Sequence, residues 1–227
     1  MSIFVAGARV PLMALMLTLA CLGHKAGAEE SAALPDAARA AGLVDVTALI
    51  PGLVLDVRYA TTNNFVGAVV YPGPRCWLQA GVAERLAAVQ ANLVAQGLGL
   101  KIFDCYRPFS VQERFWTLVA DERYVGKPRR DSQGDPLEGS RHNRGAAVDV
   151  SLVNLASGEE LAMPTDYDDF SERAAADYGD LSAEVIANRK ILTDAMAAHG
   201  FTVLPSEWWH FDAEGWEEYP LLDIELR

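Results

Sequence analysis

Positive charge is in short supply in this sequence, because 19 lysines and arginines stand against 31 aspartates and glutamates, for a formal net charge of −12. No patch interleaves basic and aromatic residues in the way that phosphate backbones require, so nucleic acid is excluded as a partner. Internal repeats and low-complexity tracts are also absent from the sequence. The acidity by itself indicates solubility.

No apolar run is long enough for a comfortable membrane span. Residues 10–20 form an apolar run that follows a basic residue, and the small residues 26–28 come after it. This order is typical of a secretory signal peptide, which we place at residues 1–28. A secreted, periplasmic protein without stable membrane insertion is therefore expected. The alternative is a lipoprotein attached through Cys21, but Thr18 stands where such signals usually carry leucine.

Cysteine is scarce, and only Cys76 and Cys105 follow the predicted signal peptide. An even pair in a secreted chain predicts one disulfide. Two buried free thiols are the alternative. Residues 29–227 have the length of one domain.

The hydrophobic pattern predicts an α+β fold with a central antiparallel sheet flanked by helices, since strands and helices alternate without a regular βαβ order. Ser110 and Glu113 have the spacing of a capping box, which predicts a helix that starts at Ser110. Residues 125–145 form a long polar loop, a feature that is often functional. Helices are expected over residues 80–96, 110–121 and 181–198, and strands over 53–59, 98–104, 146–152, 201–204 and 208–211.

Three histidines follow the predicted signal peptide, and two of them have acidic residues nearby. His142 precedes Asp149, and His210 follows Glu207, whereas His199 lies at a helix end where a cation is favourable. Two imidazoles and one carboxylate can hold zinc and leave a fourth position for water, which is the arrangement of a catalytic site. A zinc-bound water has a pKa of about 7. A second carboxylate could then move the proton.

The two acids differ in their position along the chain. Asp149 lies inside a predicted strand, whose rigidity suits a metal ligand, while Glu207 lies at a strand edge. Side chains alternate along an ideal strand, so Glu207 and His210 would point to opposite faces. The chain near Pro205 must turn if both are to reach one metal ion. Each motif alone also has a plainer interpretation, as a loop histidine with a solvated aspartate or as core packing around two tryptophans.

The combined motifs resemble those of the D-alanyl-D-alanine metallopeptidases, whose fold is shared with lysostaphin-type and hedgehog-type zinc domains. The dipeptidase branch, known from vancomycin resistance, is the branch they resemble most, over essentially all of residues 29–227. The motifs are Ser140-x-His142-x-x-Gly145-x-Ala147-x-Asp149, Glu207-Trp208-Trp209-His210, and residues 59–67, 104–108 and 163–168.

This resemblance implies one zinc ion per chain, with His142, Asp149 and His210 as its ligands. It further implies that Glu207 is the general base and acid, and that Arg107 polarises the scissile carbonyl. A guanidinium directed at developing oxyanion charge makes physical sense in that role. The implied reaction is hydrolysis of the D-alanyl-D-alanine dipeptide.

The family also places a tyrosine, a serine and an aspartate around the free amine of the substrate, here Tyr59, Ser140 and Asp168. An ammonium group favours a carboxylate partner, so Asp168 is the natural one. Core packing remains an alternative for Tyr59, and a solvated acid for Asp168. Two other functions stay open: a D,D- or L,D-carboxypeptidase or endopeptidase of the same fold that acts on cell-wall peptides, and a non-catalytic cell-wall binding module.

Overall fold

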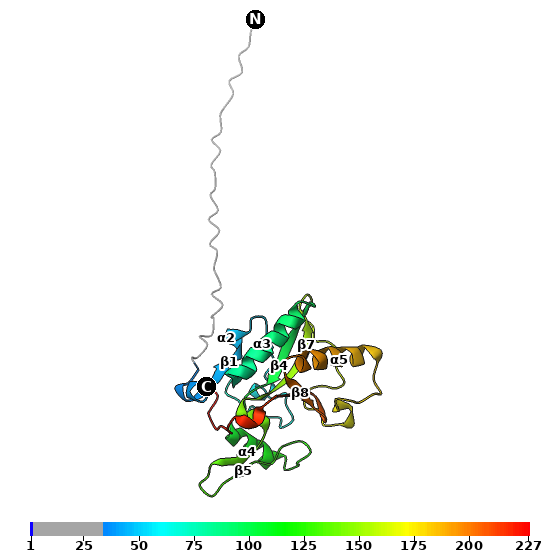
Figure 1. Ribbon diagram of the computed structural model, residues 1–227. Coiled ribbons are helices and arrows are strands. Elements are labelled where there is room, and N and C mark those ends of the chain that lie inside the picture. Colours follow the sequence, from blue (N-terminus) through cyan, green and yellow to red (C-terminus); the bar gives the residue numbers. More distant parts are fainter. Residues whose placement is uncertain (2–33) are drawn as a thin grey trace. The chain divides into compact units, whose positions relative to one another are not determined.

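A five-stranded sheet lies at the centre of the protein, whose structure is a computed structural model (Figure 1). The structure describes Met1 and residues 34–227, and the latter lie within one compact unit. The predicted signal peptide and Cys21 lie outside the described residues. None of the helices in the described part combines the length and apolarity needed to cross a bilayer. In spatial order the strands are β2 (Val54–Leu55), β4 (Leu98–Asp104), β7 (Ala147–Asn154), β9 (Glu207–Ala213) and β8 (Phe201–Leu204).

The sheet is mixed, so the prediction of an antiparallel sheet is wrong at one edge. β2 runs parallel to β4, while the other three pairs are antiparallel. A parallel pair needs a long crossover, and the chain from β2 to β4 supplies one that contains α3 (Ala80–Val94). The strand predicted over residues 53–59 is also wrong for most of its length. Its end turns into the 3-10 helix η1 (Arg58–Ala60).

Two long helices pack on the sheet, as predicted (Figure 1). α3 contacts β4 and α5 (Ala183–Ala197), and α5 contacts β7 and β8. Apolar side chains on one face of α3 are fully buried, which is the usual reason for an amphipathic helix to dock. Gly97, at φ 77°, ends the turn that follows α3, in a conformation that glycine adopts without strain.

The helix α4 (Phe109–Leu118) begins one residue before the predicted start. The predicted capping box is wrong, because the Ser110 side chain does not cap this helix. Instead, the carboxylate of Asp223 accepts a hydrogen bond from the backbone N–H of Ser110 at 2.8 Å. Glu113 forms an ion pair with Arg130. A residue far along the chain thus replaces the local cap.

The long polar loop contains regular structure that the sequence did not predict. It forms a short hairpin and then the 3-10 helix η2 (Arg141–Arg144), which ends at Gly145. Gly145 has φ 65°, and a Cβ atom there would lie 2.6 Å from a side-chain carbon of Leu43. The remaining short elements are α1 (Asp36–Ala40), β1 (Leu43–Asp45), α2 (Val46–Leu49), β3 (Trp77–Gln79), β5 (Arg129–Arg130), β6 (Pro136–Glu138), η3 (Glu172–Ala174) and η4 (Trp216–Glu218).

Candidate active site

Three neighbouring strands place polar residues in one row across the sheet. Asp104 of β4 pairs in register with Asp149 of β7, and Asp149 pairs in register with His210 of β9. Directly opposite residues in antiparallel strands have Cβ atoms about 4.5–5.5 Å apart. The row therefore brings two acids and a histidine together inside the protein, where all three are buried.

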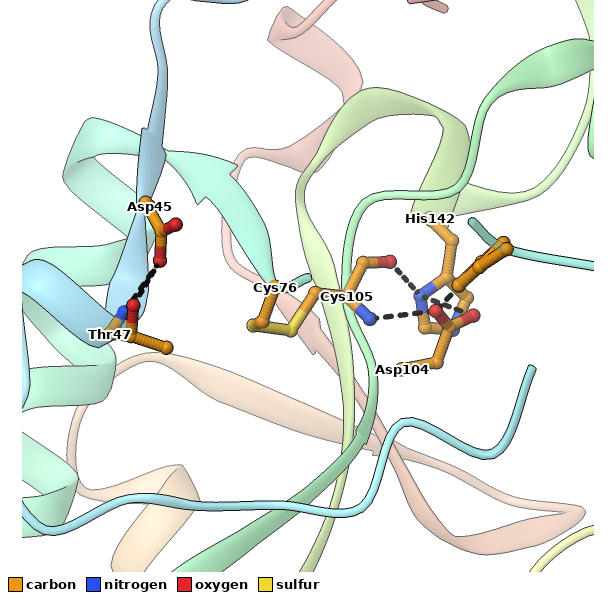
Figure 2. Close-up of a disulfide and its surroundings, with 7 residues drawn as sticks. Asp45, Thr47, Cys76, Asp104, Cys105 and His142 are labelled. Atoms are coloured by element: carbon orange, nitrogen blue, oxygen red, sulfur yellow. Dashed lines mark hydrogen bonds and ion pairs between the residues drawn. A yellow bond between two sulfur atoms is a disulfide. The ribbon is translucent and has the colours of Figure 1, made fainter. Parts of the chain in front are cut away.

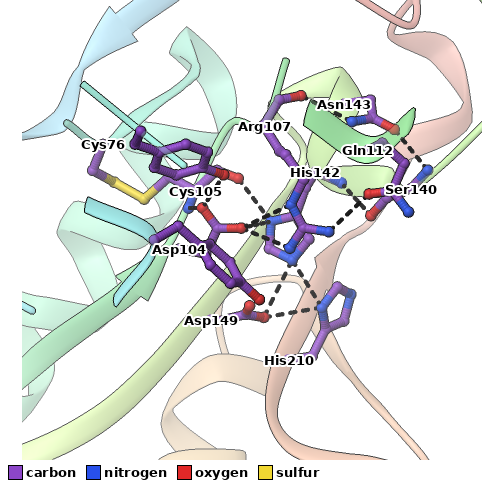
Figure 3. Close-up of polar contacts among 12 residues, drawn as sticks. Cys76, Asp104, Cys105, Arg107, Gln112, Ser140, His142, Asn143, Asp149 and His210 are labelled. Carbon is purple, nitrogen blue, oxygen red and sulfur yellow. Dashed lines mark hydrogen bonds and ion pairs between the residues drawn. A yellow bond between two sulfur atoms is a disulfide. The ribbon is translucent and has the colours of Figure 1, made fainter. Parts of the chain in front are cut away.

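His142 reaches this row from η2 and completes a small triangle of ligand atoms (Figure 3). His142 Nε2 lies 3.1 Å from His210 Nδ1 and 3.2 Å from Asp149 Oδ1. His210 Nδ1 lies 3.0 Å from the same carboxylate oxygen. Ligands of a tetrahedral metal at about 2.0–2.1 Å would lie roughly 3.3 Å from one another. The three residues therefore fit a metal ion with little movement.

Each histidine is oriented by a hydrogen bond on its other ring nitrogen. His142 Nδ1 donates to the backbone carbonyl of Cys105 at 2.7 Å, and His210 Nε2 donates to Asp212 at 3.0 Å. In the neutral form of each ring, these bonds place the proton on the outer nitrogen and leave His142 Nε2 and His210 Nδ1 able to bind a metal ion at the centre of the triangle. Both rings are thus arranged as metal ligands.

The charges and hydrogen bonds of the triangle stabilise a positive charge next to the ionised carboxylate of Asp149. Burial by itself would lower the pKa of His210, but hydrogen bonds to Asp149 and Asp212 raise it to about 10. Burial by itself would raise the pKa of Asp149, but His142 and His210 lower it well below the usual range. A buried carboxylate that stays ionised between two imidazoles is an environment in which a cation is stabilised.

Glu207 lies beside the triangle but outside it. Its Oε2 is 4.0 Å from His210 Nδ1, and its side chain makes no hydrogen bond to another residue within 34–227. Burial raises the pKa of this carboxyl. A carboxylate near a metal site with free oxygens and a raised pKa has the properties of a proton carrier.

An irregularity in β9 explains how Glu207 and His210 both reach the site, which an ideal strand would not allow. Val203 of β8 pairs with Phe211, but the next residue, Leu204, pairs with Glu207. Residues 208–210 of β9 therefore have no paired residues in β8, and the strand bulges there. The turn that the sequence required near Pro205 is this bulge.

Arg107 lies buried in the segment that follows β4 and is held by two side chains (Figure 3). Its Nε and one terminal nitrogen donate to Asp104 at 3.1 and 2.7 Å, and the other terminal nitrogen donates to Gln112 at 2.8 Å. The guanidinium also lies 4.9 Å from the ring centre of Phe115. Asp104 and Gln112 were not among the predicted site residues, although Asp104 is an acid at the end of an apolar strand.

Asp168 is the one non-glycine residue with positive φ, at 61°, in the described part of the chain. Its Oδ1 accepts a hydrogen bond from Tyr59 at 3.2 Å, whereas its buried Oδ2 has no hydrogen-bond partner there. Burial, and then the charge of Asp149, raise the pKa of Asp168 well above its usual range. Strained backbone and an unpaired buried oxygen are both typical of ligand sites.

Tyr167 links Tyr59, the hydrogen-bond partner of Asp168, to the ligand triangle. Its hydroxyl donates to Asp149 Oδ2 at 2.8 Å and lies 3.2 Å from the hydroxyl of Tyr59. This tyrosine was also missed by the sequence analysis. Its position directly before Asp168 was the available signal.

The ligand triangle lies on one cavity of about 400 Å³. Ser140 lines it as well, and its Oγ accepts the backbone N–H of His142 at 3.3 Å, which caps η2. His199 does not line this cavity. All eight residues predicted for metal binding, catalysis and substrate binding do: Tyr59, Arg107, Ser140, His142, Asp149, Asp168, Glu207 and His210.

A disulfide joins Cys76 and Cys105 next to the site, with Cα atoms 5.1 Å apart (Figure 2). Both cysteines are buried. The backbone N–H of Cys105 donates to Asp104 at 2.9 Å, and its carbonyl accepts from His142. The bond therefore anchors the backbone that holds both His142 and Asp104, the partner of Arg107.

Removing this disulfide is expected to lower the free energy of unfolding by about 3–4 kcal/mol, because the bond closes a loop with a sequence separation of 29. Chemical denaturation of Cys76→Ala/Cys105→Ala against the oxidised wild type measures the change. Peptide mapping without reductant should recover the two cysteines in one linked pair. Unlinked peptides, or equal stability, would contradict the role assigned to the bond.

Comparison with known proteins places the chain in a family. The family model described as D-ala-D-ala dipeptidase matches residues 39–221. A D-alanyl-D-alanine dipeptidase of Escherichia coli is 33% identical over 180 residues, covering 79% of this chain and 89% of the relative. Namesakes from Enterococcus faecalis and Streptomyces coelicolor are 31% and 32% identical, covering 75% and 73% of this chain and 90% and 88% of the relatives. The chain belongs to the D-ala-D-ala dipeptidase family of peptidases.

Proposed function

We propose that this protein hydrolyses the D-alanyl-D-alanine dipeptide with the help of one zinc ion held by His142, Asp149 and His210. The observation that carries the proposal is the triangle of ligand atoms 3.0–3.2 Å apart, with the free carboxylate of Glu207 beside it. The names of the relatives supply the substrate.

The zinc ion, Glu207 and Arg107 have separate roles in this reaction. A bound zinc ion supplies a water of lowered pKa and polarises the substrate carbonyl. Glu207 accepts the proton of the attacking water and delivers it to the departing amine. Arg107 keeps N–H groups on both terminal nitrogens after bonding Asp104 and Gln112, and it directs them at the negative charge that develops on the carbonyl oxygen.

The free amine of the dipeptide binds at Asp168. Its buried Oδ2 is unpaired within residues 34–227, and an ammonium group gives that oxygen a charge-assisted hydrogen bond. Tyr59 holds the other carboxylate oxygen, and Ser140 lines the same cavity. An enclosed acid of this kind favours a dipeptidase over a carboxypeptidase or endopeptidase, which must admit a longer peptide on the amine side.

Separate alanine substitutions of His142, Asp149 and His210 are expected to remove most of the bound zinc, because each deletes one of three ligands. Elemental analysis of the purified variants measures this. The matched control is His199→Ala, since His199 does not line the cavity. Full zinc occupancy in any of the three variants would remove that residue from the ligand set.

We also propose that the protein works in the periplasm. The disulfide supports this proposal, because such bonds persist in oxidising compartments. Fractionation of the source cells should recover the dipeptidase activity with periplasmic proteins. Recovery with the cytoplasm would contradict it.

A further inference from the structure

Arg141 lies at one end of a line of contacts that passes through the metal site. His210 Nε2 donates to Asp212 Oδ1, and Asp212 Oδ2 lies 3.1 Å from Arg141 Nη1. The Arg141 guanidinium also lies over the ring of Trp216, 4.8 Å from its centre. The arginine is thus held in place on the side of His210 that faces away from the ligand triangle.

Asp168 occupies the opposite end of this line. It contacts Tyr59, whose hydroxyl meets Tyr167, and Tyr167 in turn donates to Asp149. Asp149 lies on β7, and Asp212 lies on the adjacent strand β9. The ligand atoms are therefore linked to an acid through Tyr167 and Tyr59, and to a cation through Asp212. A dipeptide has the same pattern, with a positive end, a scissile bond and a negative end.

Arg141 is one of three arginines that line the cavity, and it has the most available hydrogen-bond donors. Arg107 donates from three nitrogens to Asp104 and Gln112. Arg123 donates from two nitrogens to the carboxylate of its near neighbour, and its side chain is 75% exposed. Apart from its ion pair with Asp212, the Arg141 guanidinium makes no hydrogen bond to any residue within 34–227, and its side chain is 36% exposed.

A second cavity, of about 770 Å³, meets the first at Arg141. The two cavities share Arg141, Leu204 and Trp216 as lining residues. The stacked pair of Arg141 and Trp216 therefore forms part of the wall that ends the first cavity on this side. A substrate that extended from the first cavity into the second would pass next to this guanidinium.

We propose that Arg141 binds the free α-carboxylate of the dipeptide and so selects substrates that end at this point. The proposal rests on the proposed function and assigns the carboxylate end of that same site. A guanidinium presents a planar fork of N–H donors that matches a carboxylate, and stacking on Trp216 orders the fork in advance. The ion pair with Asp212 involves Nη1 of Arg141, so other N–H groups of the guanidinium remain available to a ligand.

The test compares D-alanyl-D-alanine with its C-terminal amide on the zinc-loaded enzyme. Arg141→Gln is expected to raise KM for the acid by roughly 10- to 100-fold, the effect of losing a hydrogen bond to a charged group. KM for the amide should not change, since the amide has no carboxylate to lose. The preference for the acid should therefore disappear in Arg141→Gln and return in part in Arg141→Lys.

Controls separate recognition from a structural role. Arg123→Gln removes another arginine of the same cavity and should keep the wild-type preference for the acid. Zinc affinity, measured by chelator competition, should be equal in wild type and Arg141→Gln. An unchanged acid preference in Arg141→Gln, or an equal rise in KM for acid and amide, would overturn the proposal.

A wild-type enzyme that hydrolyses neither compound would instead refute the proposed function. In that case, dissociation constants of the same two compounds, measured by calorimetry, test whether Arg141 binds the carboxylate. A dissociation constant for the acid that rises in Arg141→Gln supports the assignment without turnover. Equal binding of the acid by both proteins overturns it.

Discussion

Glu207→Ala is expected to lower kcat by at least about 10²–10⁴-fold while the protein keeps its zinc and its fold. Glu207 stands 4.0 Å from the nearest ligand atom of His210, so its loss leaves the ligand triangle intact. The variant then lacks the carboxylate that we propose to accept the proton of the water and to protonate the leaving amine. KM should change less than kcat, because this interaction is needed mainly in the transition state.

The measurement pairs zinc content with kcat on one preparation. Glu122→Ala provides a matched control, because Glu122 is another glutamate that lines the cavity. A zinc-replete and fully active Glu207→Ala would refute the mechanism. A zinc-free variant whose activity returns with added metal would make Glu207 a ligand.

Acetylation of the amine of the dipeptide is expected to lower kcat/KM sharply. A neutral amide leaves the buried carboxylate of Asp168 without its cation, and breaking such a buried pair typically costs about 3–5 kcal/mol. That energy corresponds to a loss in kcat/KM of roughly 10²-fold or more. Steady-state kinetics on the free and the acetylated dipeptide measure the difference. Equal rates on an N-acetylated tripeptide would favour the carboxypeptidase alternative.

Asp168→Asn should reproduce this loss with the unmodified dipeptide. Asparagine tolerates the positive φ of this position, so the substitution removes the charge without adding backbone strain. Asp166→Asn, two residues earlier in the same loop, serves as the control. Similar kinetics in Asp168→Asn and the control would show that the ammonium binds elsewhere.

The parts of the fold that depend on local periodicity were predictable from the sequence. The spacing of apolar residues located α3 and α5, because a helix that buries one face repeats that face every three to four residues. The parallel edge strand β2 was not predictable in this way. A strand of two residues carries almost no pattern, and its direction depends on a crossover of more than forty residues.

The residues of the candidate site also fall into a group that the sequence predicted and a group that it did not. His142, Asp149 and His210 could be proposed because few side chain types bind zinc and few such residues occur in this chain. Their supporting partners Asp104, Tyr167 and Asp212 were not assigned a role, since the roles of ordinary acids and tyrosines depend on contacts across strands and loops. The cap of α4 was predicted wrongly for the same reason, because Asp223 lies far along the chain from the helix start that it caps.

The bulge in β9 has a consequence for protein engineering. Glu207 and His210 share a cavity because residues 208–210 lack paired partners in β8. Grafting the Glu-Trp-Trp-His sequence onto a regular hairpin would direct the acid and the imidazole to opposite sides of the ribbon. A designer who wishes to transplant this chemistry must therefore copy the defect in the strand together with the side chains.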